Sequence, residues 1–225
     1  VTTPRDYYVP IPGVSGGQKD KLTHAGIYGI DASMRTLGEL YETDINYYAR
    51  LNFTSLIDIV DTLGGVDVYS ELAFQTGTES GCIVDVQEGW NHLNGEQALA
   101  FSRERHELAD GDNQRGKNQQ AVLTAMLRKC LSPTMLLKAG TIMNQVSSEV
   151  ETNLSQAQIN SLIKYQLNKN ATWTIQSVAA TGTNDKGYCY SSGDTPLFIM
   201  DPDEDVVQEI IDLANVVEEG GTLKD

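Results

Sequence analysis

The sequence predicts a mixed α/β fold, with helices layered around a central sheet in a single domain. Segments typical of strands and of helices alternate along the chain. The 225 residues, 40% of them hydrophobic, suffice for one buried core. The sequence has no internal repeat, low-complexity tract or interdomain linker, which favours one domain.

The amino-terminal part is predicted to contain two strands separated by a helix. Residues 1–12 resemble a strand that ends at a proline-punctuated turn, and residues 13–18 a flexible glycine-rich loop. Apolar residues at helical spacing predict a helix over residues 31–42. A short strand is expected over residues 47–51.

The clearest helix is predicted to begin at Asn52. Its apolar face follows the i, i+3, i+4, i+7 spacing and comprises Phe53, Leu56, Ile57, Val60 and Leu63. Gly64 and Gly65 are expected to end this helix, because glycine readily adopts the backbone conformation found after a helix C-terminus. Residues 66–69 then alternate as a strand.

The middle of the chain is predicted to be turn-rich at first and helical afterwards. Residues 75–89 have the composition of turns, interrupted by a strand-like segment at 82–84. Asn94 and Gln97 have the spacing of a capping box, which predicts that a helix begins there. The helices expected in this part cover residues 95–101, 119–131 and 133–146.

The last third is predicted to contain two helices and two strands. Ser155 and Gln158 form a second capping box at the start of a helix. The remaining segments are expected to be a strand over 172–180, a loop over 181–193, a strand over 197–200 and a helix over 203–218.

The charge balance excludes one class of partner. Acidic residues outnumber Lys and Arg by 31 to 16, which gives a net charge of −15 and argues against a nucleic-acid binder. A local basic patch for an anionic ligand remains compatible with this charge. No run of about 18 apolar residues occurs, and no signal peptide. The chain begins at Val1 rather than Met, so we expect a fragment or a processed form.

The three cysteines fit no zinc-binding spacing. Cys130 lies on an apolar helical stripe and is expected to be buried and free. Cys82 and Cys189 both lie in glycine-rich surroundings, where a disulfide between them is one alternative and two free thiols the other.

The informative stretch for chemistry is residues 93–120. It contains four basic residues within 15 positions, interrupted by acids: Arg103, Arg105, Arg115 and Lys117. If the preceding helix ends near Phe101, the two arginines at i and i+2 would share one face of an extended segment and point into one pocket. The planar guanidinium binds phosphate oxygens in pairs, which suits such a pocket. The alternative is an ordinary solvated charged face.

Several motifs in order favour the pocket. The sequences TPRDYYVPIPG at 3–13, KDKLTHAGIYG at 19–29, GGVDV at 64–68, LNGEQALAFSRER at 93–105 and GDNQRGKNQQ at 111–120 resemble those of the LytR–CpsA–Psr family. The resemblance is strong through residue 131 and weaker in the last 90 residues.

This resemblance implies a three-layer α/β/α sandwich around a central mixed sheet. Residues 1–225 would form a single LytR–CpsA–Psr catalytic domain that is truncated at its N-terminus, with the first strands missing. Proteins of this family bind a polyprenyl pyrophosphate, with arginines and a magnesium ion on the pyrophosphate. The aspartates that hold Mg²⁺ would lie upstream of Val1, so we expect no metal ligands in this chain.

The resemblance also carries site residues onto this sequence. The catalytic residues would be Arg103, Arg105, Asp112 and Arg115. The pyrophosphate would be bound by Arg5, Asp6, Lys21, Arg103, Arg105, Arg115 and Gln119, with Lys19 as an alternative to Lys21. The family usually has arginine where this chain has Asn118, which would weaken the charge of the site. The side chains expected to converge on one pocket mouth are Arg5, Arg103, Arg105, Arg115 and Gln119.

The implied activity is a phosphotransferase. It would attach a polyprenyl-pyrophosphate-linked glycopolymer, of the teichoic acid or capsular polysaccharide class, to peptidoglycan at the extracellular face of a bacterial membrane, with an N-terminal membrane anchor absent from this chain. The alternatives are a pyrophosphatase and a non-catalytic polyprenyl-phosphate binding module. His24, His92 and His106 match no ligand spacing and are not expected to act as bases, and Ser102 has no recognisable triad partners.

Overall fold

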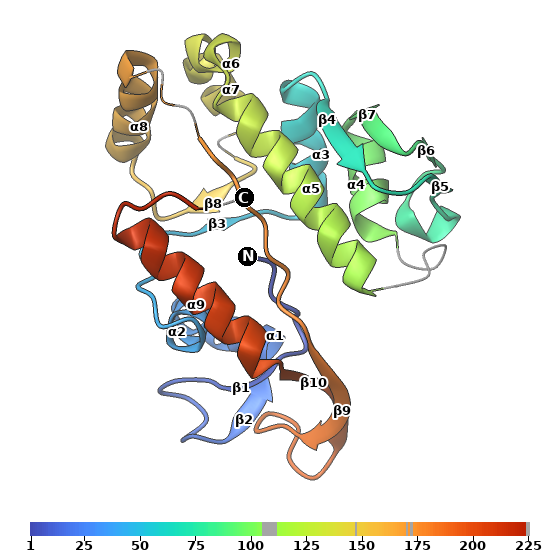
Figure 1. Cartoon of the computed structure of the whole chain (residues 1–225), viewed down its shortest axis with the longest axis vertical. Helices are drawn as coiled ribbons and strands as arrows, with labels where there is room; N and C mark the ends of the chain where they lie inside the picture. Colours follow the sequence, from blue (N-terminus) through green and yellow to red (C-terminus); the bar gives the residue numbers. More distant parts are fainter. Residues whose placement is uncertain (105–111, 147, 170, 172, 224–225) are drawn as a thin grey trace. The chain divides into compact units, whose positions relative to one another are not determined.

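The computed structural model describes residues 1–104, 112–146, 148–169, 171 and 173–223 (Figure 1). The chain divides into two compact units. The first consists of Val1–Asn46 and Gln176–Asp225, and the second of Tyr47–Ile175. Each unit has hydrophobic clusters of its own. That both units belong to one truncated domain stays a prediction.

The first unit combines residues from both ends of the sequence. Its elements are β1 (Tyr8–Pro10), β2 (Lys19–Lys21), α1 (Leu22–Ala25), the 3-10 helix η1 (Gly26–Tyr28), α2 (Ile30–Leu40), β9 (Gly182–Tyr188), β10 (Pro196–Pro202) and α9 (Glu204–Glu218). Strands β1 and β2 pair antiparallel, as do β9 and β10. A parallel bridge between Tyr7 and Met200 joins the two pairs, so the strand directions in this unit are mixed.

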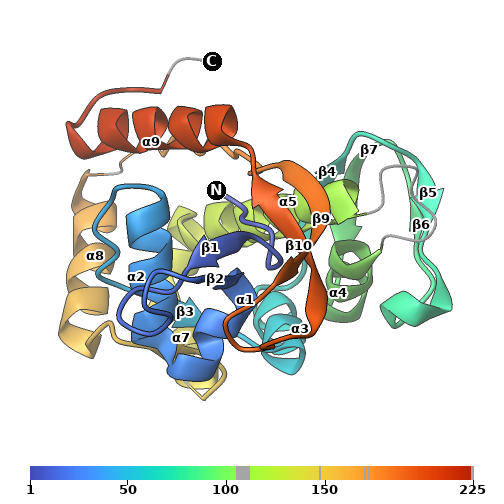
Figure 2. The same ribbon diagram turned by 90° about the horizontal axis from the view of Figure 1, so that it is seen from below.

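Helices α2 and α9 pack on the strands of this unit (Figure 2). Tyr7 and Val9 alternate toward the core and are 0% and 5% exposed. They contact Ile210 and Ile211 of α9, together with apolar residues of α2. The side chain of Asp203 caps α9 by accepting from the Val206 amide.

The second unit is mainly helical. Its elements are β3 (Ala49–Arg50), α3 (Phe53–Thr62), β4 (Val66–Ser70), β5 (Phe74–Gln75), the 3-10 helix η2 (Thr78–Ser80), β6 (Asp85–Val86), β7 (Gly89–Leu93), α4 (Gly95–Arg103), α5 (Asp112–Cys130), α6 (Pro133–Leu137), α7 (Ala139–Val146), β8 (Glu151–Thr152) and α8 (Gln156–Lys169). Strands pair antiparallel as β4 with β7, β5 with β6, and β3 with β8.

The core of the second unit lies between α3, α4, α5 and the β4–β7 hairpin. Phe101, Val60 and Val122 are almost completely buried there. Gly95 lets α4 approach α3 closely, because a β-carbon at this position would clash with the Ile57 backbone. The Gly95 amide instead donates to Asp61 Oδ1 at 2.7 Å.

The prediction of a mixed α/β fold is confirmed, as are its capped helices. Asn52 accepts from the Ser55 amide at the start of α3, and Asn94 with Gln97 forms the predicted capping box of α4. Positive φ angles at Gly64 (74°) and Gly65 (82°) follow the end of α3. The strands of the described residues form five two-stranded antiparallel ladders, rather than one continuous ladder through a central sheet.

Three strand-level predictions are wrong. In the described part of 172–180 only an isolated bridge at Ala179 forms. Gly182–Tyr188, expected to be a loop, is strand β9, because all seven of its residues pair with the more apolar β10. The segment 82–84 is not a strand; pairing begins at Asp85.

The structure also shows the bonding state of the cysteines and whether any described helix could span a membrane. Cys82, Cys130 and Cys189 are all free, so the alternative of two unbonded thiols holds for Cys82 and Cys189. Cys130 is free as expected but exposed; it continues the spacing of buried Val122 and Met126, but it is the last residue of α5. Within the described ranges, no helix is both long and apolar enough to span a bilayer.

Candidate functional site

Three of the predicted pyrophosphate ligands meet in the first unit. Lys21 Nζ donates to Asp6 Oδ1 at 2.8 Å, and these side chains are 14% and 19% exposed. Arg5 Nε lies 3.6 Å from the other carboxylate oxygen, and the Arg5 side chain is 76% exposed. The structure therefore assembles two cations on one carboxylate, with the guanidinium facing solvent. Asp6 holds Lys21 more closely than it holds Arg5.

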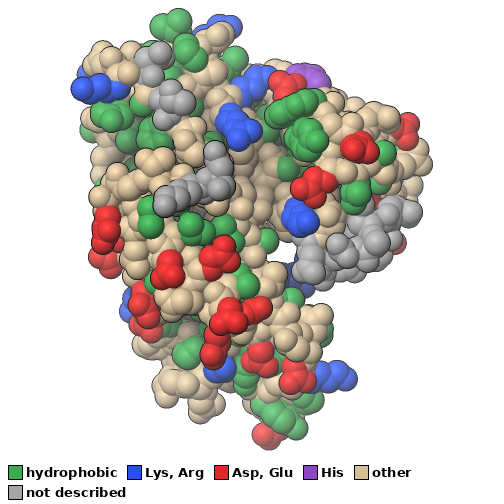
Figure 3. All heavy atoms as spheres, viewed as in Figure 1, with side chains coloured by type: hydrophobic (Ala, Val, Ile, Leu, Met, Phe, Trp, Pro, Cys, Tyr) green, Lys and Arg blue, Asp and Glu red, His purple; other side chains and the backbone are tan. Residues whose placement is uncertain are grey.

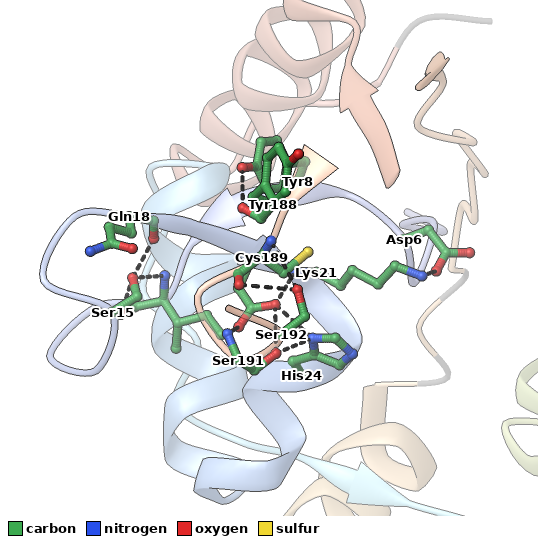
Figure 4. A network of polar contacts seen from close by, with 12 residues as sticks. Asp6, Tyr8, Ser15, Gln18, Lys21, His24, Tyr188, Cys189, Ser191 and Ser192 are labelled. Atoms are coloured by element: carbon green, nitrogen blue, oxygen red, sulfur yellow. Dashed lines mark hydrogen bonds and ion pairs between the residues drawn. The ribbon is translucent and has the colours of Figure 1, made fainter. Parts of the chain in front are cut away.

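The backbone of this group is fixed from two sides. The Arg5 carbonyl accepts from the Thr23 amide at 2.9 Å, and the Asp6 carbonyl accepts from the Met200 amide at 2.8 Å. Figure 4 shows Lys21 extending toward Asp6, away from the neighbouring polar cluster. Lys19, the alternative candidate, instead has its Nζ 5.4 Å from the Tyr8 ring centroid. Lys21 is thus the lysine that contacts Asp6.

A second polar cluster surrounds the residue before Lys21 (Figure 4). Asp20 is 0% exposed, and its carboxylate accepts from the Lys21 amide, the Ser191 amide and the Ser191 hydroxyl at 2.7–3.1 Å. His24 Nδ1 lies 2.6 Å from Asp20 Oδ1. Burial by itself would raise the pKa of Asp20, but the hydrogen bonds from His24, Lys21 and Ser191 outweigh burial and lower it.

This Asp–His–Ser grouping is not a nucleophile relay. A relay needs the acid on one imidazole nitrogen and the hydroxyl on the other. Here Asp20 and Ser191 both contact Nδ1 of His24, Ser191 at 2.8 Å. Cys189 beside them is buried, and burial raises the pKa of its thiol, so the thiolate is disfavoured. The cluster instead ties β2 and α1 to the loop that follows β9.

In the second unit, Arg103 is the last residue of helix α4. The helix ends two residues later than expected, and Glu104 is the first extended residue, with ψ 133°. Arg103 is therefore helical, so its pairing with Arg105 on an extended face is not observed. Its guanidinium carbon lies 5.0 Å from the centroid of Phe53, the first residue of α3, which is a cation–π distance. Arg105 and His106 lie outside the described residues.

The long helix α5 carries the remaining predicted ligands. It begins at Asp112, seven residues before the predicted start, and the Asp112 side chain lies outside the described part of the structure. Arg115 is half-buried and Gln119 is exposed. Residues four apart are neighbours on a helix surface. Arg115 and Gln119 therefore begin a stripe along α5.

The same stripe becomes apolar farther along α5. Leu123 and Leu127 continue the four-residue spacing and are 52% and 45% exposed. The core-facing side of the helix carries other residues: Val122, Ala125 and Met126. The sequence left open which apolar residues of this helix pack in the core. The structure separates a buried face from a solvent-facing stripe with a cationic end and an apolar end.

Asn118, where the family usually has arginine, points into the protein. It is 2% exposed; its Nδ2 donates to the Phe101 carbonyl and its Oδ1 accepts from Gln114 Nε2, both at 3.1 Å. The bond to Phe101 joins α5 to the last turn of α4, which carries Arg103, and the bond from Gln114 lies within α5. Asn118 therefore connects the two helices that carry the predicted ligands.

Glu104 is a buried residue that the sequence reasoning missed. It lies in the charged stretch for which a solvated face was the alternative, but it is 1% exposed. Its Oε2 accepts from the Gly77 amide at 2.5 Å and from Ser80 Oγ at 2.9 Å. Its helical spacing of three from buried Phe101 was the available signal. Glu104 holds the end of α4 to the loop that contains η2.

The described residues do not assemble a metal site by themselves. No three His, Cys, Asp or Glu side chains converge among them. Asp6 is paired with Lys21, and Asp20 is occupied by hydrogen bonds. Arg5, Asp6 and Lys21 belong to the first unit, and Arg103, Arg115 and Gln119 to the second. The convergence of all of them on one pocket stays a prediction.

Comparison with known sequences decides the family. Residues 1–199 match the sequence model of the LytR_cpsA_psr family, which is well over half of the chain. The chain belongs to the LytR–CpsA–Psr family. A LytR–CpsA–Psr relative from Bacillus mycoides, named polyisoprenyl-teichoic acid–peptidoglycan teichoic acid transferase TagU, is 38% identical over 160 residues, covering 71% of this chain and 50% of the relative.

A second relative with the same name, from Oceanobacillus iheyensis, is 30% identical over 197 residues, covering 84% of this chain and 59% of its own length. The chain thus spans about half the length of the curated relatives it matches. The crystal structure of Bacillus subtilis TagV matches with a TM-score of 0.75 at 25% identity over 98% of this chain and 82% of that one. A structure described as TagT bound to LI-WTA matches with a TM-score of 0.70 at 29% identity, over 93% and 74%.

These similarities extend over nearly the whole chain, so the LytR–CpsA–Psr α/β fold applies to both of its units.

Proposed function

We propose that this LytR–CpsA–Psr chain carries a phosphotransferase activity that attaches a glycopolymer of the teichoic acid class from a polyprenyl-pyrophosphate carrier to peptidoglycan. The observation that carries the proposal is the stripe on α5. From Arg115 through Gln119 to Leu123 and Leu127 it changes from cationic to apolar over about 18 Å. A lipid pyrophosphate has the same division into an anionic head and an apolar tail.

Arginine chemistry supports the head-group assignment. The guanidinium stays charged and offers paired donors that fit phosphate oxygens. Arg103 is held by the Phe53 ring at the end of α4, and α4 is tied to α5 through Asn118. This anchoring reduces the reorganisation needed when negative charge develops on the phosphates. The names of the TagU relatives and the TagT structure bound to LI-WTA agree with a teichoic acid donor.

The reaction would be one in-line displacement. A sugar hydroxyl oxygen of peptidoglycan forms a bond to the phosphorus that bears the glycopolymer, and the bond from that phosphorus to the bridging oxygen breaks. The polyprenyl phosphate leaves with the bridging oxygen and its electron pair, and the hydroxyl proton passes to a base, for which Asp112 is the candidate. Arg103, Arg105 and Arg115 would stabilise the negative charge on the phosphates, and Gln119 would orient a phosphate oxygen.

The setting of this activity is also part of the proposal. The donor and acceptor would meet at the extracellular face of a bacterial membrane, with an anchor upstream of residue 1. A magnesium ion on the pyrophosphate would need only one or two carboxylates besides the phosphate oxygens, and no group of three metal-ligating side chains occurs among the described residues.

A non-catalytic binding module is the second candidate, and Asn118 favours it. The family's usual arginine is replaced there by a buried amide that binds Phe101, so the site carries one fewer cation. Such a module would bind the lipid pyrophosphate without turnover.

Product analysis on the full-length protein separates these functions. Lipid-linked teichoic acid is incubated with and without peptidoglycan, and both phosphorus-containing products are identified. A glycopolymer joined to peptidoglycan through a phosphodiester supports the transferase. Release of free glycopolymer phosphate whether or not the acceptor is present would identify a pyrophosphatase. Binding of the donor with no product under either condition would identify a binding module.

A further inference from the structure

The β4–β7 hairpin presents two aromatic rings to solvent. Tyr69 and Trp90 face each other across the ladder and are 52% and 66% exposed. Their ring centroids lie 5.5 Å apart at an interplanar angle of 75°, so each ring keeps a face or an edge open. The opposite face of the hairpin is buried through Val66, Val68 and Leu93, so the rings stand on a packed support.

Polar groups lie next to the rings on the same face. Asp67 and His92 form the next exposed pair, about 7 Å along the strands. His92 Nδ1 lies 2.7 Å from Asp67 Oδ1, and these side chains are 61% and 64% exposed. An exposed pair of this kind contributes little to stability. Asp67 and His92 can therefore give up their mutual contact and hydrogen-bond to the hydroxyl groups of a ligand at a small cost in free energy.

The turn that leads into Trp90 is already fixed. Asn91 Nδ2 donates to the carbonyls of Gln87 and Gly89 at 2.8 and 3.0 Å, and Asn91 Oδ1 accepts from the Gln87 amide at 2.9 Å. The aromatic surface therefore needs no ordering before it binds, which reduces the entropic cost of association.

The charge around the rings selects a neutral ligand. Residues 66–93 contain five acidic residues and no Lys or Arg. Lys117 of α5 reaches the end of β4, but it pairs with Glu71 at 3.8 Å. An anionic polymer or an anionic lipid surface would be repelled here. Figure 3 shows hydrophobic side chains gathered over β4, bordered by a histidine, by acidic side chains and by Lys or Arg side chains.

We propose that Tyr69, Trp90, Asp67 and His92 form a binding surface for the neutral sugar backbone of a peptidoglycan glycan strand. Pyranose rings with equatorial hydroxyls present C–H groups on their faces, which stack on aromatic rings, and hydroxyls at their edges, which bind Asp67 and His92. The rings expose roughly 300 Å² together, too little for a stable protein interface. The choice of peptidoglycan as the source of the glycan rests on the proposed function.

The direction of α5 shows which end of the β4–β7 ladder lies nearest to Arg115, a predicted pyrophosphate-binding residue of the second unit. Lys129 Nζ donates to the Gly65 carbonyl at 2.6 Å at the start of β4, whereas Lys117 contacts Glu71 beyond its end. Helix α5 therefore runs antiparallel to β4. Tyr69 lies toward the end of the hairpin nearest the first turns of α5, which carry Arg115. The rings themselves lie on the face of the ladder opposite to the one that packs against α5.

Cosedimentation with peptidoglycan sacculi, stripped of teichoic acid by acid, tests the proposal on the full-length protein. We expect Trp90→Ala to weaken binding by about two- to tenfold, Tyr69→Ala to weaken it less, and Trp90→Phe to retain most of it. The matched control is Trp173→Ala, since Trp173 is 53% exposed in the same unit and lies outside the surface. Thermal unfolding of each variant establishes that it is folded.

Equal binding by wild type and Trp90→Ala would overturn the proposal. So would binding that requires teichoic acid on the sacculi, or self-association that Trp90→Ala abolishes. The assay contains no lipid donor and measures binding alone, so its outcome does not depend on the transfer reaction. Absence of transfer by the wild-type protein, together with Trp90-dependent sedimentation, would refute the proposed transferase and leave the glycan surface standing.

Discussion

Two neighbouring residues of β2, Asp20 and Lys21, belong to polar groups of opposite character. The Asp20 group is closed: its carboxylate is fully buried and accepts hydrogen bonds from the Lys21 amide and from Ser191, and His24 Nδ1 lies 2.6 Å away. The Lys21 group is open, because Lys21 and Asp6 adjoin Arg5, whose side chain is 76% exposed. Strand alternation sends the two side chains to opposite faces. The comparison indicates that a group of polar residues suits ligand binding when its donors are exposed to solvent, as in Arg5, and not merely when it contains many hydrogen bonds.

The largest expected effect is on the rate of transfer, and it distinguishes a predicted pyrophosphate-binding arginine from an ordinary surface arginine. Arg105→Lys in the full-length protein should lower glycopolymer transfer by about 100- to 1000-fold, because lysine keeps the charge but loses the planar paired donors. Arg50→Lys is the control, since Arg50 is 68% exposed and pairs with Glu151 only at 3.5 Å. Transfer and thermal unfolding are measured on the same preparation. Unchanged transfer in Arg105→Lys would place Arg105 on an ordinary solvated face.

A substitution in the Asp20 group should change the stability of the fold rather than the transfer activity. Asp20→Asn is expected to lower the free energy of unfolding by about 3 kcal/mol, because an amide cannot accept from all the donors that now meet the buried carboxylate. Asp185→Asn, an exposed acid on β9, should change stability by no more than about 0.5 kcal/mol. Urea unfolding measures both. Equal, small losses would show that the Asp20 network is not a stabilising contact.

The same group predicts a pH dependence. The pKa of Asp20 is lowered in the folded protein, so it contributes stability above the unfolded pKa of about 3.9, and this contribution is lost as the pH falls through the folded value. Wild type should therefore lose more stability than Asp20→Asn between pH 5 and pH 3. Parallel urea titrations at several pH values measure the difference. Identical slopes would contradict the lowered pKa.

The stripe on α5 predicts an effect on lipid binding without an effect on folding. Leu123→Asp should weaken binding of the polyprenyl-pyrophosphate donor by about tenfold, because a charge replaces apolar area in contact with the tail. Leu137→Asp is the matched control, since Leu137 is 79% exposed on α6 in the same unit. Detergent-based lipid binding and thermal unfolding separate the two properties. Equal binding by both variants would show that the polyprenyl tail does not contact this stripe.

The smallest expected effect distinguishes the two lysines of β2. Lys21→Ala should lower the free energy of unfolding by about 1 kcal/mol, because it leaves the half-buried Asp6 carboxylate without its closest partner. Lys19→Ala removes only a contact with the Tyr8 ring and should cost less than about 0.5 kcal/mol. Donor binding should fall only for Lys21→Ala. A larger loss of binding in Lys19→Ala would reverse the assignment.

The sequence by itself determined the features that depend on local spacing. Asn52, Asn94 and Ser155 predicted helix starts correctly, because a capping side chain needs only an amide two or three residues away. The ordered motifs from Thr3 to Gln120 were enough to indicate the LytR–CpsA–Psr family and the types of residue that bind a pyrophosphate.

Only the tertiary structure decided which polar residues face inward. Glu104 and Asn118 sit among charged neighbours in sequence, yet they are buried because Ser80 and Phe101 supply partners from other elements. Strand β9 is polar along its length and becomes a strand by pairing with β10. Val122 and Leu123 are both apolar residues of α5, but only the side of the helix that meets α4 and β4 is buried, and it carries Val122. Spacing along the chain defines faces, whereas burial of a face depends on the partner that the fold brings to it.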